Sequence, residues 1–140
     1  MNIKRVALTT NYNGAVLNRA NNVYDPTDLV VTVSSAATCG SGKQICVFDQ
    51  DYGNNNLYGW VACRAGSSGA NPNRTCEHQW VRFNLAYTPP SYQRLACHEL
   101  AHTVGLRHGT ETASCVFPNI AQATTSALTT HDRAHINARY

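Results

Sequence analysis

The chain has 140 residues and a formal net charge of +3, from 11 Lys and Arg against 8 Asp and Glu. This length predicts a single domain, residues 1–140, with a modest hydrophobic core. Only 14% of the residues are charged and the basic ones are scattered, which argues against nucleic-acid binding and against a polybasic membrane surface. We therefore expect a monomer without nucleic-acid or membrane partners.

The first two thirds of the chain predict short strands separated by polar turns. No segment approaches the roughly 20 apolar residues of a membrane span, and the first residues contain no apolar leader. We expect an exported form to begin after a removed leader. The longest turn, rich in Gly, Ser and Asn, is AGSSGANPN (65–73). The predicted strands are RVALTT (5–10), DLVVTVSS (28–35), QICVFDQ (44–50), YGWVACR (58–64) and QWVRFNLAY (79–87).

The last third of the chain predicts two helices. Ser91 is a suitable N-cap for a helix of about fourteen residues that reaches Gly105, and a mixed loop follows. The segment LTTHDRAHINARY (128–140) predicts the second helix, because Thr129 and Asp132 have the spacing of a capping box. On that helix Asp132, Ile136 and Tyr140 share one face. Strands followed by helices predict an α+β fold.

Six cysteines suit an oxidising, extracellular compartment better than the cytosol. None of them stands in a C-x-x-C pair, so a cysteine-based zinc ribbon or a thioredoxin-like motif is not supported. Three disulfides are the expected state, although six cysteines allow many pairings. Short loops favour sequence neighbours as partners, which are Cys39–Cys46, Cys63–Cys76 and Cys97–Cys115.

The segment HELAHTVGLRH (98–108) has the spacing of a metal site. At about 100° per residue, His98 and His102 lie one turn apart on a helix, so both imidazoles can reach a single ion. Glu99 lies on the flank of that face, close enough to reach a water on the ion without replacing a ligand. Gly105 can take the left-handed conformation that ends a helix, which lets His108 turn back as the third ligand. The segment therefore predicts a zinc site.

The same segment matches H-E-x-x-H-x-x-G-x-x-H and resembles the signature of the metzincin zinc endopeptidases. With its strands and C-terminal helix, the chain is similar to small bacterial matrixin-like or snapalysin-like peptidases, and His108 favours the matrixin-like side. The resemblance implies a zincin-like fold, with a twisted mixed sheet packed on the active-site helix. It also implies a secreted zinc metalloendopeptidase, in which zinc activates a water and Glu99 is the general base. We expect a protein or peptide substrate to lie along an edge strand, near residues 58–64.

The chain departs from the metzincin pattern in two places. Metzincins have a methionine in a tight turn beneath the zinc, whereas the only methionine here is Met1. The corresponding stretch SCVFP (114–118) places Val116 in that position, where we expect it to pack without binding the ion. The helix that metzincins usually have between their first strands is not evident in NGAVLNRANNVYDP (13–26), which suggests an abbreviated member.

The alternative function is a non-catalytic binding module, a pseudoprotease that keeps zinc and disulfides for stability alone. The missing turn methionine supports this alternative. The presence of Glu99 counts against it, because a structural zinc has no use for a base.

Other polar side chains have ordinary interpretations. His131 and His135 stand one helical turn apart, but without a companion glutamate or third ligand they are expected to be surface or core-edge residues. His78 is expected to be a loop or strand-end side chain without a partner nearby. A polar turn is the favoured interpretation of DQDYGNNN (49–56), although calcium could bind three of its side chains, Asp49, Asp51 and Asn54.

Overall fold

The computed structural model describes residues 1–40, 42–64, 76 and 78–140. The predicted turn at 65–73 lies outside the described residues. The strands are β1 (Asn2–Val6), β2 (Thr32–Ala36), β3 (Gln44–Gln50), β4 (Gly59–Cys63) and β5 (His78–Asn84). The helices are α1 (Thr10–Arg19), its π-helical continuation η1 (Ala20–Tyr24), α2 (Tyr92–Thr103) and α3 (Thr130–Asn137).

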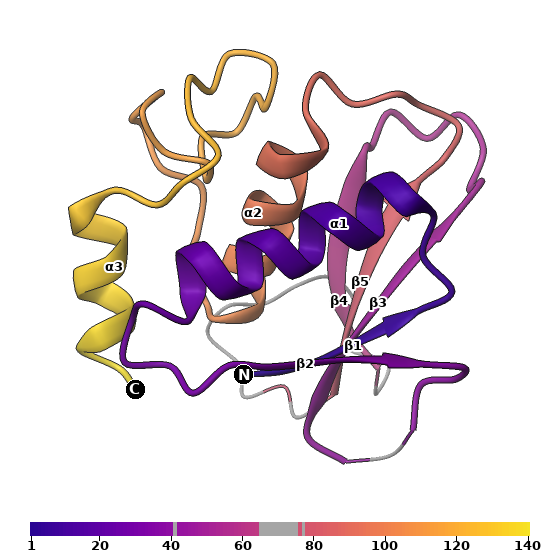
Figure 1. The fold of residues 1–140 in the computed structure, drawn as a ribbon. Helices are drawn as coiled ribbons and strands as arrows, with labels where there is room; N and C mark the ends of the chain where they lie inside the picture. The colour runs from indigo at the N-terminus through magenta and orange to yellow at the C-terminus, as the bar shows by residue number, and fades with distance from the viewer. Residues whose placement is uncertain (41, 65–75, 77) are drawn as a thin grey trace.

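The strands form one mixed sheet in the order β2-β1-β3-β5-β4. Neighbouring strands are parallel except for β4, which runs antiparallel to β5. Among the strands that the structure describes, β4 therefore forms one edge and β2 the other. Figure 1 shows α1 crossing the sheet beside α2, while α3 lies away from the strands near the C-terminus. This arrangement confirms the predicted α+β fold with a mixed sheet and a C-terminal helix.

Strand β3 lies in the middle of the sheet, and its residues suit a buried position. Its first four residues are all buried, because they lie between two neighbouring strands and under covered faces. Three of these four residues, Ile45, Cys46 and Val47, are apolar, and a continuous apolar run is typical of a strand inside a parallel sheet. The edge strands β2 and β4 are instead mostly half-exposed or exposed. The boundaries of β3 are the predicted ones, residues 44–50.

The N-terminal region corrects two predictions. The strand predicted at 5–10 is β1 at Asn2–Val6, and residues 10–24, where no helix was evident, form α1 and η1. Asn and Gly are poor helix formers, but the apolar residues recur with a helical period and become the face that packs inward. Tertiary burial therefore overrides the local preference. The buried residues of this face are Tyr12, Ala15, Val16, Ala20, Val23 and Tyr24.

The contacts of α1 and η1 join the sheet to α2. Tyr12 stacks on Phe83 of β5 with ring centroids 4.3 Å apart, and it meets Tyr92 of α2 edge to face at 4.8 Å. The buried Tyr24 hydroxyl donates a hydrogen bond of 2.6 Å to the carbonyl oxygen of Cys97. The N-terminal helix is thus part of the support beneath α2.

All three predicted disulfides are present, Cys39–Cys46, Cys63–Cys76 and Cys97–Cys115. They confirm the pairing of sequence neighbours. None of the helices in the described part of the chain combines the length and apolar character needed to cross a bilayer.

The C-terminal helix α3 is anchored by one buried carboxylate. Asp132 accepts hydrogen bonds from the backbone N–H and hydroxyl of Thr129 at 2.9 and 2.8 Å, which confirms the capping box. The same carboxylate oxygen accepts a bond of 2.7 Å from the Ser114 hydroxyl in the loop after α2. Ile136 on the same face is buried, but Tyr140 lies beyond the end of the helix and is exposed.

We predict that Asp132→Ala lowers the free energy of unfolding by about 2–3 kcal/mol, because it removes the carboxylate half of the capping box and leaves the Ser114 hydroxyl without its acceptor. Asp25→Ala, at an exposed aspartate, should change it by no more than about 0.5 kcal/mol. Denaturant unfolding measures both values. Equal effects of the two substitutions would contradict the anchoring role of Asp132.

Candidate metal centre

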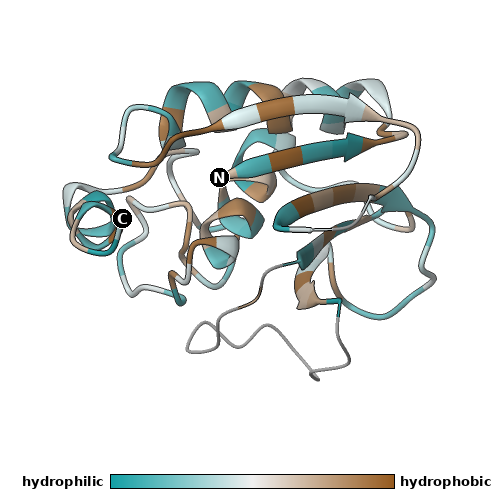
Figure 2. Ribbon diagram, turned by 90° about the horizontal axis from the view of Figure 1, so that it is seen from below, coloured by the Kyte–Doolittle hydropathy of each residue, from teal (hydrophilic) through white to brown (hydrophobic). Residues whose placement is uncertain are grey.

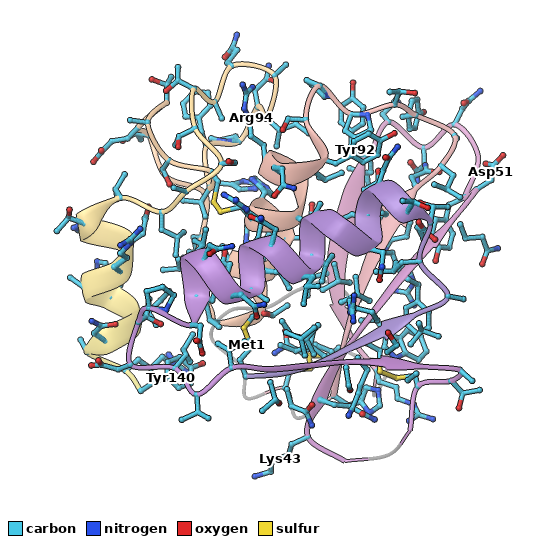
Figure 3. The ribbon with its side chains drawn as sticks, in the orientation of Figure 1. Met1, Lys43, Asp51, Tyr92, Arg94 and Tyr140 are labelled. Atoms are coloured by element: carbon cyan, nitrogen blue, oxygen red, sulfur yellow. A yellow bond between two sulfur atoms is a disulfide. The ribbon has the colours of Figure 1, made fainter. Side chains whose placement is uncertain are left out.

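Helix α2 carries the first part of the site. It begins where the Ser91 side chain accepts a hydrogen bond from the backbone N–H of Arg94, which confirms Ser91 as the N-cap. Arg94 in turn donates a bond of 3.2 Å to the carbonyl of Ile120, in the loop that follows the helix. Figure 3 shows Tyr92 and Arg94 at this end of α2, beside that loop. The interior of the helix is mostly buried, including His98 and Glu99.

The end of α2 turns the chain as predicted. Gly105 has a φ of +89°, in the left-handed region where a side chain is disfavoured. Its N–H donates to the carbonyl of His102, and the N–H of Leu106 donates to the carbonyl of Ala101. These two bonds form a Schellman motif, which ends the helix and reverses the chain direction. The reversal brings His108 back to the face of α2 that carries the other histidines.

The three predicted ligands converge through one nitrogen each. The Nε2 atom of His98 lies 3.1 Å from Nε2 of His102 and 3.1 Å from Nε2 of His108. Ligand nitrogens bound tetrahedrally at about 2.0–2.1 Å from zinc lie roughly 3.3 Å apart, so the nitrogen spacing fits that ion closely. His98 is buried, His102 is partly buried and His108 is exposed, which leaves the cluster open on one side.

Hydrogen bonds on the other ring nitrogens set the tautomer of the two helical histidines. Nδ1 of His98 donates to the carbonyl of Cys115 at 2.8 Å, and Nδ1 of His102 donates to the carbonyl of Leu106 at 2.8 Å. Each Nε2 therefore presents a lone pair toward the centre of the cluster. Burial, followed by the neighbouring His102, lowers the pKa of His98 to about 4, so this imidazole is neutral at neutral pH. Burial also lowers the pKa of His102.

Glu99 lies beside the histidines in a dry environment. Its side chain is 4% exposed, and burial raises the pKa of its carboxyl group to about 8. Gly59 of β4 approaches it closely: a Cβ atom added at Gly59 would lie 3.1 Å from Oε1 of Glu99 and 3.0 Å from the carbonyl oxygen of Arg82. Sequence analysis missed this contact, although a glycine inside a strand is a known signal of close approach.

The Cys97–Cys115 disulfide connects the helix to one of the hydrogen-bond acceptors. Cys97 precedes the first ligand, and Cys115 supplies the carbonyl that accepts the Nδ1 proton of His98. Val116 follows and is 1% exposed, and its carbonyl accepts a bond of 3.1 Å from the N–H of Gly109, next to His108. The loop segment with Val116 thus lies beside the third ligand, and its role as the floor of the site stays a prediction.

A cleft of about 640 Å³ opens beside the cluster. One wall is the edge strand β4 with the residues before it, 56–61, and the other is the loop after α2. Apolar side chains of both walls face the cleft, including Leu57, Leu106 and Ile120, together with Leu95 of α2. The cleft also contains Glu99 and the histidines, so a chain lying along β4 would pass the cluster.

The remaining candidates do not join this centre. His78 was expected to have no partner nearby, but at the start of β5 its Nε2 lies 2.7 Å from Sγ of Cys39 and 3.5 Å from Sγ of Cys46. These three residues form the second group with metal-ligand spacing in the described part of the chain, yet both sulfurs belong to a disulfide and neither is a thiolate.

Two of the three side chains considered as alternative calcium ligands, Asp49 and Asp51, accept hydrogen bonds from neighbouring groups. One carboxylate oxygen of Asp49 accepts hydrogen bonds from the N–H and hydroxyl of Thr9, at the N-terminus of α1. Asp51 accepts a bond of 2.8 Å from the N–H of Gly53, and Figure 3 shows it at the periphery of the molecule. The bond of Asp51 matches the polar-turn interpretation, whereas Asp49 belongs to β3 and contacts the start of α1. Among the described residues, no cluster that could hold a metal ion includes these side chains.

Three imidazole nitrogens converge beside a buried carboxylate, in a cleft along a sheet edge, and their spacing suits a zinc ion. The model of the matrixin family matches residues 53–140, well over half of the chain, so this protein belongs to the matrixin family of zinc metalloproteases. The match includes the metal cluster and β4 but not α1. A comparison with curated proteins found no match.

We predict that the double substitution Cys97→Ala and Cys115→Ala lowers zinc affinity about 10- to 100-fold, because the carbonyl that orients His98 is no longer tied to α2. Loss of this 18-residue link should also lower the free energy of unfolding by about 3 kcal/mol. Competition with a chelating dye measures the affinity.

The control is the pair Cys39→Ala and Cys46→Ala, which removes a disulfide without a carbonyl at the histidines. This control should lose stability while zinc affinity stays at the wild-type value. An unchanged zinc affinity in the Cys97 and Cys115 variant would show that the loop holds the acceptor without the disulfide.

Proposed function

We propose that the protein is a secreted zinc-dependent endopeptidase, in which His98, His102 and His108 hold the ion and Glu99 is the general base. The observation that carries the proposal is the convergence of three Nε2 atoms beside a buried carboxylate, at a cleft along an antiparallel edge strand. Membership in the matrixin family supports the same activity. The three disulfides suit an extracellular protein.

The substrate is proposed to bind as an additional strand beside β4. The outer edge of β4 carries backbone N–H and C=O groups that an extended peptide can pair with, which provides affinity without a particular sequence. The apolar side chains of the cleft walls, among them Leu57 and Ile120, favour substrates with an apolar residue near the scissile bond.

The chemistry divides between the ion and one carboxylate. When bound, zinc supplies Lewis-acid chemistry, because it stabilises negative charge on oxygen and makes water more acidic. In its ionised form, Glu99 takes a proton from the attacking water on one carboxylate oxygen as the water oxygen adds to the peptide carbonyl carbon. It then gives this proton to the peptide nitrogen as the C–N bond breaks, so one residue acts as base and then as acid. His98 and His102 remain fixed by their carbonyl partners throughout.

The non-catalytic alternative is not favoured. A structural zinc is normally enclosed by four protein ligands, whereas this cluster offers three and opens to a cleft. Burial of the Glu99 carboxyl group costs stability, and a functional role would explain why a glutamate occupies this position.

We predict that Glu99→Gln lowers kcat by at least about 1,000-fold while the protein still holds one zinc per chain, because the amide keeps the shape of the side chain but cannot accept the proton. A broad peptide library followed by mass spectrometry measures cleavage, and elemental analysis measures zinc. Chelation of the wild-type protein should abolish cleavage, and added zinc should restore it. A Glu99→Gln protein near wild-type activity would falsify the assigned role.

We also predict that Gly59→Ala lowers kcat/KM about 10- to 100-fold with zinc content unchanged, because the new methyl group displaces the Glu99 carboxylate. The matched control is Gly14→Ala, where an added Cβ meets no atom within 4 Å. In a Glu99→Gln background the Gly59 substitution should cause no further loss, as expected for two changes that act on one group. If the losses of kcat/KM caused by the two substitutions add in the double variant, Gly59→Ala does not act through Glu99.

A further inference from the structure

A second pair of histidines lies on α3, outside the metal centre. His131 and His135 are both exposed and stand one helical turn apart. Their Nε2 atoms lie 3.2 Å from each other, so the two rings direct the same nitrogen toward a common point.

The ligand pair of the metal centre provides an internal comparison. His98 and His102 have the same sequence spacing, with an Nε2–Nε2 distance of 3.1 Å, a centroid distance of 4.7 Å and an interplanar angle of 89°. The ring centroids of His131 and His135 lie 4.5 Å apart, and their ring planes meet at 85°. The surface pair therefore has the geometry of two ligands from a three-histidine set.

The helix beneath the pair is held rigidly. Asp132 and Ile136, on the adjacent face of α3, are buried, and Asp132 accepts hydrogen bonds from Thr129 at the helix start and from Ser114. Near the other end, the side-chain oxygen of Asn137 accepts a bond of 3.1 Å from the N–H of Asp28. Figure 2 shows α3 as a mainly hydrophilic helix seen nearly end on, at the edge of the molecule. A ligand pair on a fixed helix needs little reorganisation to bind an ion.

We propose that His131 and His135 form a second metal site, which binds a divalent transition ion such as Ni²⁺, Cu²⁺ or Zn²⁺ through the two Nε2 atoms. Neutral imidazole suits these ions, and solvent water completes their coordination. The site is weaker than the cluster on α2 because it has two protein ligands instead of three. In addition, within the described part of the chain no carbonyl holds either Nδ1 atom, whereas His98 and His102 each have one.

The test is a calorimetric titration of untagged, zinc-loaded protein with Ni²⁺, in which zinc occupies the cluster on α2. We expect about one Ni²⁺ per chain in the wild type, and at least a tenfold loss of affinity in His131→Ala and in His135→Ala. His78→Ala, which alters a histidine elsewhere, should bind Ni²⁺ like the wild type. Zinc-loaded protein that takes up no Ni²⁺, or variants of His131 and His135 that bind it like the wild type, would overturn the proposal.

Two further measurements separate this site from the proposed peptidase centre. Paramagnetic Ni²⁺ should broaden the ring signals of His131 and His135 in NMR spectra and leave those of His98 and His102 sharp. Retention of the protein on immobilised ions should follow Cu²⁺ over Ni²⁺ over Co²⁺, the general order of affinity for nitrogen sites. If Ni²⁺ broadens the signals of other histidines but not those of His131 and His135, the ion binds at another site and the proposal is wrong. None of these readouts depends on peptidase activity.

Discussion

Two hydrogen bonds from imidazole N–H groups to main-chain carbonyls orient His98 and His102, and much of the fold keeps those carbonyls in place. The carbonyl of Leu106 is positioned by the Schellman turn that Gly105 permits. The carbonyl of Cys115 is tied to α2 by a disulfide. Beneath α2, the N-terminal helix and the sheet bury the apolar face that carries this arrangement, so the site depends on elements from the whole chain.

Features determined by short segments could be predicted from the sequence. The spacing of His98 and His102, the turn at Gly105 and the capping box of α3 each depend on residues within one or two helical turns. The pairing of the cysteines followed from short loops in the same way. The boundaries of β3 were predicted correctly because a short apolar run between two turns is typical of a buried strand.

Features determined by distant contacts could not be predicted. The helix at residues 10–19 contains three asparagines and a glycine, and it forms because its apolar face is buried, with Tyr12 packed against Phe83 of β5 and Tyr92 of α2. The contact of His78 with a disulfide depends on the pairing of β3 with β5. The acceptors for the ring N–H groups are backbone atoms, which leave no mark in a sequence. The role of the predicted site residues in catalysis stays a prediction.

The main-chain origin of these acceptors affects how the protein tolerates mutation. A carboxylate that oriented a histidine could be deleted by a single codon change, but every residue type carries the carbonyl that His102 uses at position 106. Substitutions there can alter packing without removing the acceptor. The orientation of the rings is therefore encoded in the path of the backbone, and insertions or deletions between positions 103 and 115 threaten it more than exchanges of side chains do.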